Sequence, residues 1–173
     1  CKALPDGAGI SVNVDDHHVT LKSGRGRYTL GILPAQDFPS VEPSALADRI
    51  VIKEKTLKYL IDKTQFAMAQ QDVRYYLNGM LVELYSDKIR TVATDGHRLA
   101  LGEADAEIDG GTDRQVLLPR KAVLELARLL SFSEEPVTVE LSANLARFRL
   151  ATTVFTTKLI DGRFPEYGKV IPQ

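Results

Sequence analysis

The chain has 173 residues, of which 44% are hydrophobic and 26% are charged, and its formal net charge is −1. This composition is typical of a soluble globular protein, and the near-neutral charge excludes a uniformly basic surface while leaving room for a local basic patch. The single cysteine, Cys1, excludes a disulfide framework and a thiolate metal site, as in a protein of the reducing cytoplasm. No apolar run approaches the roughly 20 residues of a membrane span, so we expect no membrane-spanning segment.

The first part of the chain is predicted to form strands. Alternating polar and apolar residues occur in GISVNVDD and in HHVTLKSGRGRYTL, a pattern typical of half-buried strands. The stretch EPSALAD then predicts a linker, so we expect one unit at residues 1–44 and a second at residues 45–173. Because the chain opens without methionine, we also expect it to be a piece of a longer protein.

A helix flanked by strands follows the linker. The apolar run at Ile50 predicts a short strand, and Leu57, Leu60, Ile61 and Thr64 then recur at the spacing i, i+3, i+4, i+7. That spacing places them on one face of a helix. Three further strands are predicted in GMLVELYS, KIRTVAT and HRLALGEA, which completes a βαβββ unit.

A tight turn is predicted between the last two of these strands. Asp95-Gly96 between alternating segments is a strong hairpin signal, and a two-residue type I′ turn requires a positive φ at both positions. His97 and Arg98 would then lie on an exposed surface just past the turn.

The same unit recurs later in the chain. VLLPRKAVLELARLL begins at Val116, 66 residues after Ile50, and its helical stripe is Val123, Leu126, Ala127 and Leu130. Strands follow in PVTVELS, LARFRLA and VFTTKLI, and LIDGRFP near their end matches the earlier LPAQDFP. The sequence therefore predicts an α+β protein built from repeated βαβββ units, with residues 1–44 as the end of a preceding copy.

The residues predict no enzyme, metal or cofactor. Hydrolysis needs a nucleophile and a base oriented by a third group, and His97 is the only histidine within a motif. His17 and His18 are adjacent and face opposite sides of a strand, and no HxxxH, CxxC or glycine-rich phosphate loop is present. A hydrolase using Thr94, Asp95 and His97 remains an alternative, with loss of activity in His97→Ala as its signature.

Four stretches carry a resemblance to a known family: QFAMAQQDVRYYLNGM, TVATDGHRLA, PRKAVLEL and KLIDGRFPEY. They resemble the bacterial DNA polymerase III beta subunit, the sliding clamp, along the whole chain. The resemblance implies a DNA-clamp fold, with helices on one face of curved antiparallel sheets. Residues 1–44 would be the C-terminal part of the first clamp domain, and residues 45–173 the middle domain. The full-length protein would be a head-to-tail homodimer that closes into a ring.

The resemblance also implies three sets of site residues. The first binds linear motifs of partner proteins: Arg74, Leu77, Thr94, Gly96, His97, Arg98, Leu99, Pro165, Lys169 and Val170. The second contacts DNA: Gln71, Tyr75, Tyr76, Lys55, Lys58, Arg120 and Lys121. The third forms the subunit interface: Arg25, Arg27, Tyr28 and Leu30.

The helix cations and the interface residues also have plainer interpretations. The helix cations alone are typical of a solvated helix face, and KSGRGRYTL is typical of an edge strand protected by charge. Lys169 departs from the arginine common in the family, and lysine lacks the planar fork of a guanidinium group.

These expectations define a cytoplasmic, non-enzymatic processivity factor without a cofactor. It would encircle duplex DNA without reading sequence, and would recruit the replicative polymerase, the clamp loader and repair proteins through linear motifs. The alternative is a stand-alone peptide-binding scaffold module that never meets DNA. An absence of further βαβββ units in the parent gene would favour that alternative.

Overall fold

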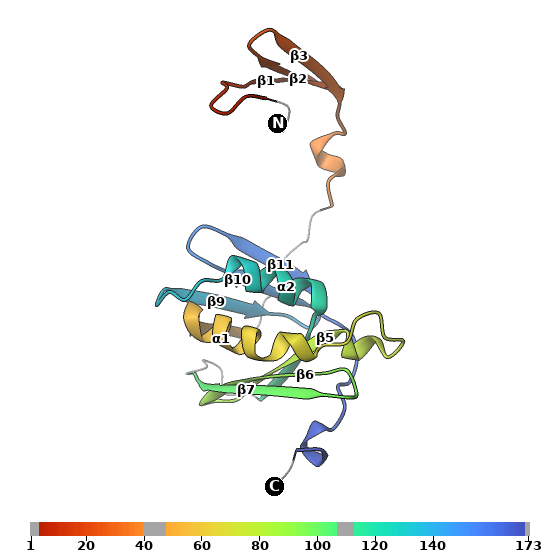
Figure 1. Cartoon of the computed structure of the whole chain (residues 1–173), viewed down its shortest axis with the longest axis vertical. Coiled ribbons are helices and arrows are strands. Elements are labelled where there is room, and N and C mark those ends of the chain that lie inside the picture. Colours follow the sequence, from red (N-terminus) through yellow and green to blue (C-terminus); the bar gives the residue numbers. More distant parts are fainter. Residues whose placement is uncertain (1–3, 40–47, 107–112, 172–173) are drawn as a thin grey trace. The chain divides into compact units, whose positions relative to one another are not determined.

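The computed structural model describes residues 4–39, 48–106 and 113–171. The chain divides into two compact units, residues 1–42 and 43–173. The smaller unit holds three antiparallel strands in the order β1 (Ser11–Val14), β2 (His18–Ser23) and β3 (Gly26–Gly31) (Figure 1). Gly24, with φ +54°, makes the turn between β2 and β3. A 3-10 helix, η1, follows at Ala35–Asp37.

One face of this small sheet is apolar. Val14, Val19 and Leu30 are neighbours across the three strands, and Tyr28 lies two residues from Leu30 on the same face. Tyr28 and Leu30 are 49% and 53% exposed. An apolar sheet face that is solvent-exposed within its own unit is typical of a surface that another element covers.

The larger unit contains two helices and eight strands within the described residues. Their chain order is β4 (Asp48–Lys53), α1 (Glu54–Thr64), β5 (Gly79–Leu84), β6 (Lys88–Thr94), β7 (Leu99–Asp105), β8 (Arg114–Pro119), α2 (Arg120–Leu129), β9 (Pro136–Leu141), β10 (Leu145–Arg149) and β11 (Val154–Lys158). Short 3-10 helices lie at Gln65–Ala67 (η2), Tyr75–Leu77 (η3) and Tyr167–Lys169 (η4). This order confirms the predicted repeat of two βαβββ units.

The two repeats exchange their first strands. The sheets have the orders β11-β10-β9-β4 and β7-β6-β5-β8, so β4 joins the strands of the second repeat and β8 those of the first. Ile50 of β4 lies opposite Val139, and Leu117 of β8 lies opposite Leu81. The sequence repeat did not predict this exchange, because periodicity within a repeat says nothing about which strand pairs with which.

The helices pack side by side over the sheets (Figure 1). The first predicted stripe is confirmed, because all four of its residues are buried. In the second stripe Val123, Leu126 and Leu130 are buried, and Ala127 is half-buried. These side chains form one apolar core with residues from both sheets. None of the helices in the described residues has the length and apolar character needed to cross a membrane.

Residues 159–170, which we call the strap, leave β11 and cross to the other sheet. The Leu159 amide donates to the carbonyl of Asn144 over 2.8 Å, and the Ile160 amide donates to the carbonyl of Leu117 over 2.9 Å. Phe164, 8% exposed, then enters a second apolar cluster that contains Leu117. The strap is therefore tied at its start to both sheets.

The buried contact between helix and sheet generates a stability prediction. Leu60 is fully buried on α1, so Leu60→Ala should lower the free energy of unfolding by about 2–5 kcal/mol, because it leaves a cavity. Leu124→Ala on α2 is the matched control, since Leu124 is 39% exposed, and it should cost about 0.5 kcal/mol. Urea denaturation measures both. Equal losses in the two variants would contradict this packing.

Candidate functional site

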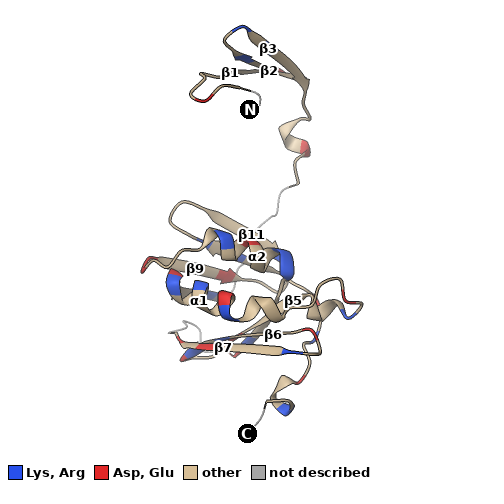
Figure 2. Ribbon diagram, viewed as in Figure 1, with Lys and Arg blue, Asp and Glu red and all other residues tan. Residues whose placement is uncertain are grey.

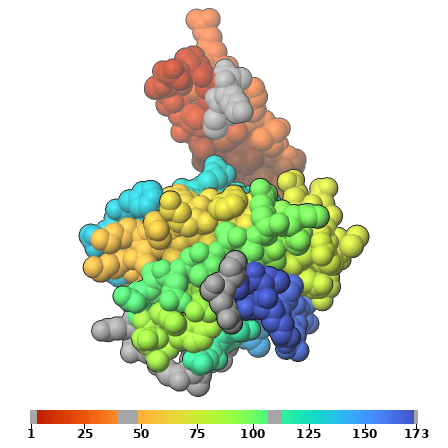
Figure 3. Space-filling model, turned by 60° about the horizontal axis from the view of Figure 1, so that its bottom comes forward, coloured from red at the N-terminus to blue at the C-terminus, as the bar shows by residue number. Residues whose placement is uncertain are grey.

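A pocket of about 440 Å³ opens on the larger unit, where η3, the β6–β7 turn and the strap meet. Figure 3 shows the C-terminal segment, in blue, lying against the green surface of the middle of the chain. Nine of the ten residues predicted to bind partner motifs line this pocket. They are Arg74, Leu77, Thr94, Gly96, His97, Arg98, Leu99, Pro165 and Val170. Three segments that are far apart in the sequence thus build one concave surface.

The β6–β7 turn differs from the predicted type I′ turn. Only Gly96, with φ +90°, is left-handed, and the loop spans four residues from Asp95 to Arg98. The Asp95 carboxylate accepts from the amides of His97 and Arg98 over 2.9 and 3.0 Å. The Thr94 hydroxyl donates to the Arg98 carbonyl over 2.7 Å and accepts from the Gly96 amide over 3.1 Å. These side-chain bonds stabilise a longer loop than Asp-Gly alone predicts.

The same bonds argue against the hydrolase alternative. The Thr94 hydroxyl donates to a backbone carbonyl, and the Asp95 carboxylate binds backbone amides and the Arg98 side chain (3.0 Å). A catalytic set would instead hold the imidazole of His97 between a nucleophile and a carboxylate. Thr94 and Asp95 therefore shape the turn. Among the described residues, no cluster of His, Cys, Asp and Glu is suited to a metal ion.

Arg74 bridges from η3 to the turn. Its Nε and Nη2 donate to the Asp72 carboxylate over 3.0 and 2.8 Å, and Nη2 also lies 3.4 Å from the Asp95 carbonyl. The hydrogen bonds from Arg74 lower the pKa of Asp72 to about 2. A Cβ at position 96 would lie 3.2 Å from the guanidinium nitrogens, so glycine there also makes room for Arg74.

The strap side of the pocket contains residues that the sequence did not predict. Glu166 and Tyr167 line this side, and Tyr76 of η3, which was expected to contact DNA, also lines the pocket. Lys169 does not line it; its side chain is exposed, and its ammonium pairs with Glu166. Tyr167 ends the KLIDGRFPEY stretch, but the sequence assigned it no role, since the strap has no helical or strand periodicity.

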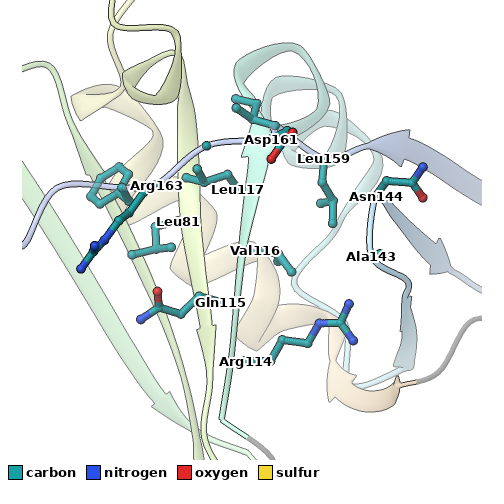
Figure 4. A pocket seen from close by; sticks show the side chains of 13 residues that line it. Leu81, Arg114, Gln115, Val116, Leu117, Ala143, Asn144, Leu159, Asp161 and Arg163 are labelled. Atoms are coloured by element: carbon teal, nitrogen blue, oxygen red, sulfur yellow. The ribbon is translucent and has the colours of Figure 1, made fainter.

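A second pocket of about 490 Å³, which we call the strap pocket, is lined by residues 159–164 of the strap and by residues of β8. Figure 4 shows the strap passing from Leu159 to Arg163 beside Leu117, with Asn144 near Leu159 and Gln115 farther along β8. None of the residues that line it was predicted from the sequence to belong to a site.

The predicted DNA-contacting cations lie on α1 and α2 (Figure 2). Lys58 is only 17% exposed, and its ammonium donates to Asp62 (3.0 Å) and to the carbonyl of Ala127 on α2 (2.8 Å). Lys55 pairs with Glu134. Lys121 is exposed and has no ion-pair or hydrogen-bond partner in the described residues. Lys58 thus joins the two helices, whereas Lys121 is available to an external anion.

The remaining residues predicted to contact DNA, a cation on α2 and three loop residues, differ in their exposure. Arg120 is half-buried, and its Nη1 lies 3.4 Å from the carbonyl of Met68. Gln71 is exposed and has φ +56°, a strained conformation for a residue with a side chain. Tyr75 is 56% exposed, and Tyr76 packs half-buried against the second apolar cluster. Gln71 and Tyr75 are therefore the loop residues open to a ligand.

The four predicted interface residues lie together in the smaller unit. Arg25 is in the β2–β3 turn, and Arg27, Tyr28 and Leu30 are in β3. Because β3 ends the order β1-β2-β3, one of its edges has no strand partner among the described residues. This placement is that of an edge strand, as the sequence predicted.

The fold is that of the DNA sliding clamps. A crystal structure of the sliding clamp from Pseudomonas aeruginosa superimposes with a TM-score of 0.91 at 47% identity, and covers all of this chain and 47% of that one. The clamp from Caulobacter crescentus gives a TM-score of 0.85 at 42% identity, covering 99% of this chain and 48% of that one. These matches confirm the predicted DNA-clamp fold.

The chain belongs to the DNA polymerase III beta subunit family. The family's central domain matches residues 51–166. The beta sliding clamps of Pseudomonas aeruginosa and Escherichia coli are 47% and 43% identical over all 173 residues. The chain spans about half the length of these curated relatives, 47% in each case.

The Asp72–Arg74 pair generates a pH prediction. Asp72 has a lowered pKa of about 2, so its pairing stabilises the fold above pH 3.8 and is lost as the pH falls towards 2. In Arg74→Gln the Asp72 midpoint should rise towards 3.8, as followed by carboxyl carbon NMR shifts. Arg128→Gln, on the outer side of α2, is the control and should leave the midpoint in place. An unchanged midpoint in Arg74→Gln would show that another group lowers this pKa.

Proposed function

We propose that the chain is the central part of a sliding clamp that tethers a replicative polymerase to DNA. Residues 1–44 would close the first clamp domain, and residues 45–173 would form the middle domain. The whole protein would be a head-to-tail homodimeric ring in the cytoplasm. It would catalyse no reaction and would act by encircling DNA. A polymerase tethered to the ring stays at a high effective concentration near its primer end even after it releases that end.

The pocket between the turn and the strap is the observation that carries the proposal. Its apolar residues include Leu77, Leu99 and Val170, and its rim holds the exposed His97 and Arg98. A pocket with an apolar floor and a few polar groups suits an extended peptide with aliphatic or aromatic anchors. Sliding clamps of Pseudomonas aeruginosa and Bartonella birtlesii have been crystallised bound to griselimycin, which supports a ligand-binding surface in this family.

The proposed linear motif carries a glutamine followed by spaced leucines and a phenylalanine, whose apolar side chains suit the apolar residues of the pocket. Val170→Ser should weaken binding of such a peptide about fivefold, because the serine loses part of the apolar contact. Val170 is 69% exposed, so the variant should fold normally. Fluorescence anisotropy of a labelled peptide measures the dissociation constant.

Val154→Ser is the matched control for this experiment. Val154 is 55% exposed on β11 and does not line the pocket, so its substitution should leave the dissociation constant unchanged. Equal affinity of the wild type and Val170→Ser would contradict a peptide site at the strap. Clamp-loader and repair partners would use the same pocket, since they would carry motifs of the same kind.

DNA would contact the exposed face of the two helices. The net charge of −1 excludes strong bulk attraction, and weak phosphate contacts suit a ring that slides. Gln71 and Tyr75 would add contacts at the loop before η3. The edge of β3 with Arg25 and Arg27 would meet the other subunit.

The exposure of the helix lysines generates a DNA-binding prediction. Lys121→Gln should lower the affinity for duplex DNA at low salt and reduce the slope of log affinity against log salt by about 1. Lys58→Gln is the comparison, because Lys58 is bound between the helices; it should lower thermal stability and leave the salt slope unchanged. Duplex binding that no helix lysine affects would contradict the proposed face, and complete absence of DNA binding would favour the scaffold alternative.

A further inference from the structure

A buried carboxylate lies between the two pockets. Glu83 of β5 is 3% exposed, although the other side chains of that strand are almost all apolar. Burial of a carboxylate is unfavourable unless hydrogen-bond donors compensate for the lost water. The groups that donate hydrogen bonds to Glu83 therefore show which segments this carboxylate holds together.

Gln115, Tyr167 and Arg90 contact the carboxylate, and Tyr85 lies beside it, where burial and the charge of Glu83 raise the pKa of the Tyr85 hydroxyl. Gln115 Nε2 donates to Oε1 over 2.7 Å, and the Tyr167 hydroxyl donates to Oε2. Arg90 Nη1 lies 3.5 Å from Oε2 and also donates to the Tyr167 hydroxyl over 2.9 Å. Arg90 is fixed in turn by Glu103, which accepts from Nε and Nη2 over 2.8 and 2.6 Å. Tyr85 follows β5, and every other member except Tyr167 belongs to one sheet.

Tyr167 is the member that belongs to the strap. Beyond Ile160, its hydroxyl makes the only hydrogen bonds from the strap to the rest of the described residues. The remaining strap ion pairs, Arg163–Glu166 and Lys169–Glu166, are internal to the strap and exposed. The ring of Tyr167 meets Phe164 edge to face, with centroids 6.4 Å apart. The Tyr167 hydroxyl, together with the buried ring of Phe164, thus holds the strap beside the peptide pocket.

The far end of the network opens into the strap pocket. Gln115 lines that pocket while its amide donates to Glu83. Tyr167 lines the peptide pocket while its hydroxyl donates to the same carboxylate. Two hydrogen bonds therefore connect the walls of the two pockets, and the strap itself borders both.

We propose that the Gln115–Glu83–Tyr167 chain of hydrogen bonds positions the strap wall of the peptide pocket and couples the strap pocket to it. The inference rests on the proposed peptide-binding function and names Tyr167 as its positioning residue. Preorganisation is the physical reason: a wall that is already in place loses less conformational entropy when a peptide binds. Without the hydroxyl, only the packing of the Tyr167 ring holds this part of the strap, so the peptide must supply more of the order of residues 165–170.

Removal of the hydroxyl is the direct test. Tyr167→Phe keeps the ring against Phe164 and should weaken binding of the glutamine-leucine-phenylalanine peptide about tenfold, as expected for a hydrogen bond to a charged group. Tyr59→Phe is the control, because Tyr59 is 50% exposed on α1 and lies outside both pockets. It should bind as the wild type does.

A second substitution separates positioning from stability. Tyr167→Phe leaves the buried charge of Glu83 with one donor fewer, so it should also lower the melting temperature. Adding Glu83→Gln removes the charge and should restore much of the melting temperature, while the peptide still binds weakly. Recovery of affinity together with stability would overturn the positioning role.

A separate pair of variants tests the coupling between the strap pocket and the peptide pocket. Gln115→Leu should weaken peptide binding about threefold, although Gln115 does not line the peptide pocket. Asp161 lines the same strap pocket, and its side chain makes no hydrogen bond within the described residues. Asp161→Asn should therefore bind the peptide as the wild type does. Equal affinity of Gln115→Leu and the wild type would overturn the coupling.

The outcomes also separate this inference from the proposed function. A wild-type chain that does not bind the peptide in NMR titration, where millimolar binding is still visible, would overturn the proposed function and the inference with it. A wild type that binds, with an unaffected Tyr167→Phe variant, would overturn the inference alone.

Discussion

The exchange of first strands between the repeats is the constraint on which the larger unit depends. β4 extends the sheet of the second repeat and β8 extends that of the first, so neither repeat has a complete sheet of its own. Separation of the repeats would break two ladders and expose the core around Leu60 and Leu126. This arrangement also makes the peptide pocket rigid, because the carbonyl of Leu117 on β8 anchors the strap.

The functional surface then arises where connections converge on that rigid core. The β6–β7 turn is held by Thr94 and Asp95, and the strap is held by Tyr167. Polar side chains thus position the irregular backbone segments, while the sheets form the rigid scaffold. Binding sites on loops positioned by a rigid scaffold are common for this reason. The helix face is a separate surface, on which Lys121 remains open to anions and Lys58 is bound.

Much of the fold could be predicted from periodicity. The stripe at Leu57, Leu60, Ile61 and Thr64 is buried as expected, because a helix that covers a sheet buries one face. The strand exchange could not be predicted, since it depends on pairing between distant segments. The Asp95-Gly96 turn was predicted with the wrong geometry, because the carboxylate of Asp95 caps a longer loop. Tyr167 was missed, because its partners Glu83 and Arg90 are about 80 residues away.

The location of a bound peptide tests the central claim most directly. We would record intermolecular NOEs between the labelled chain and the glutamine-leucine-phenylalanine peptide. The account predicts contacts from the peptide's apolar anchors to Leu99 and Val170, on the two sides of the pocket between the turn and the strap. Contacts confined to the strap pocket around Gln115 and Asn144 would contradict it, because the peptide would then lie in a pocket that neither Leu99 nor Val170 lines.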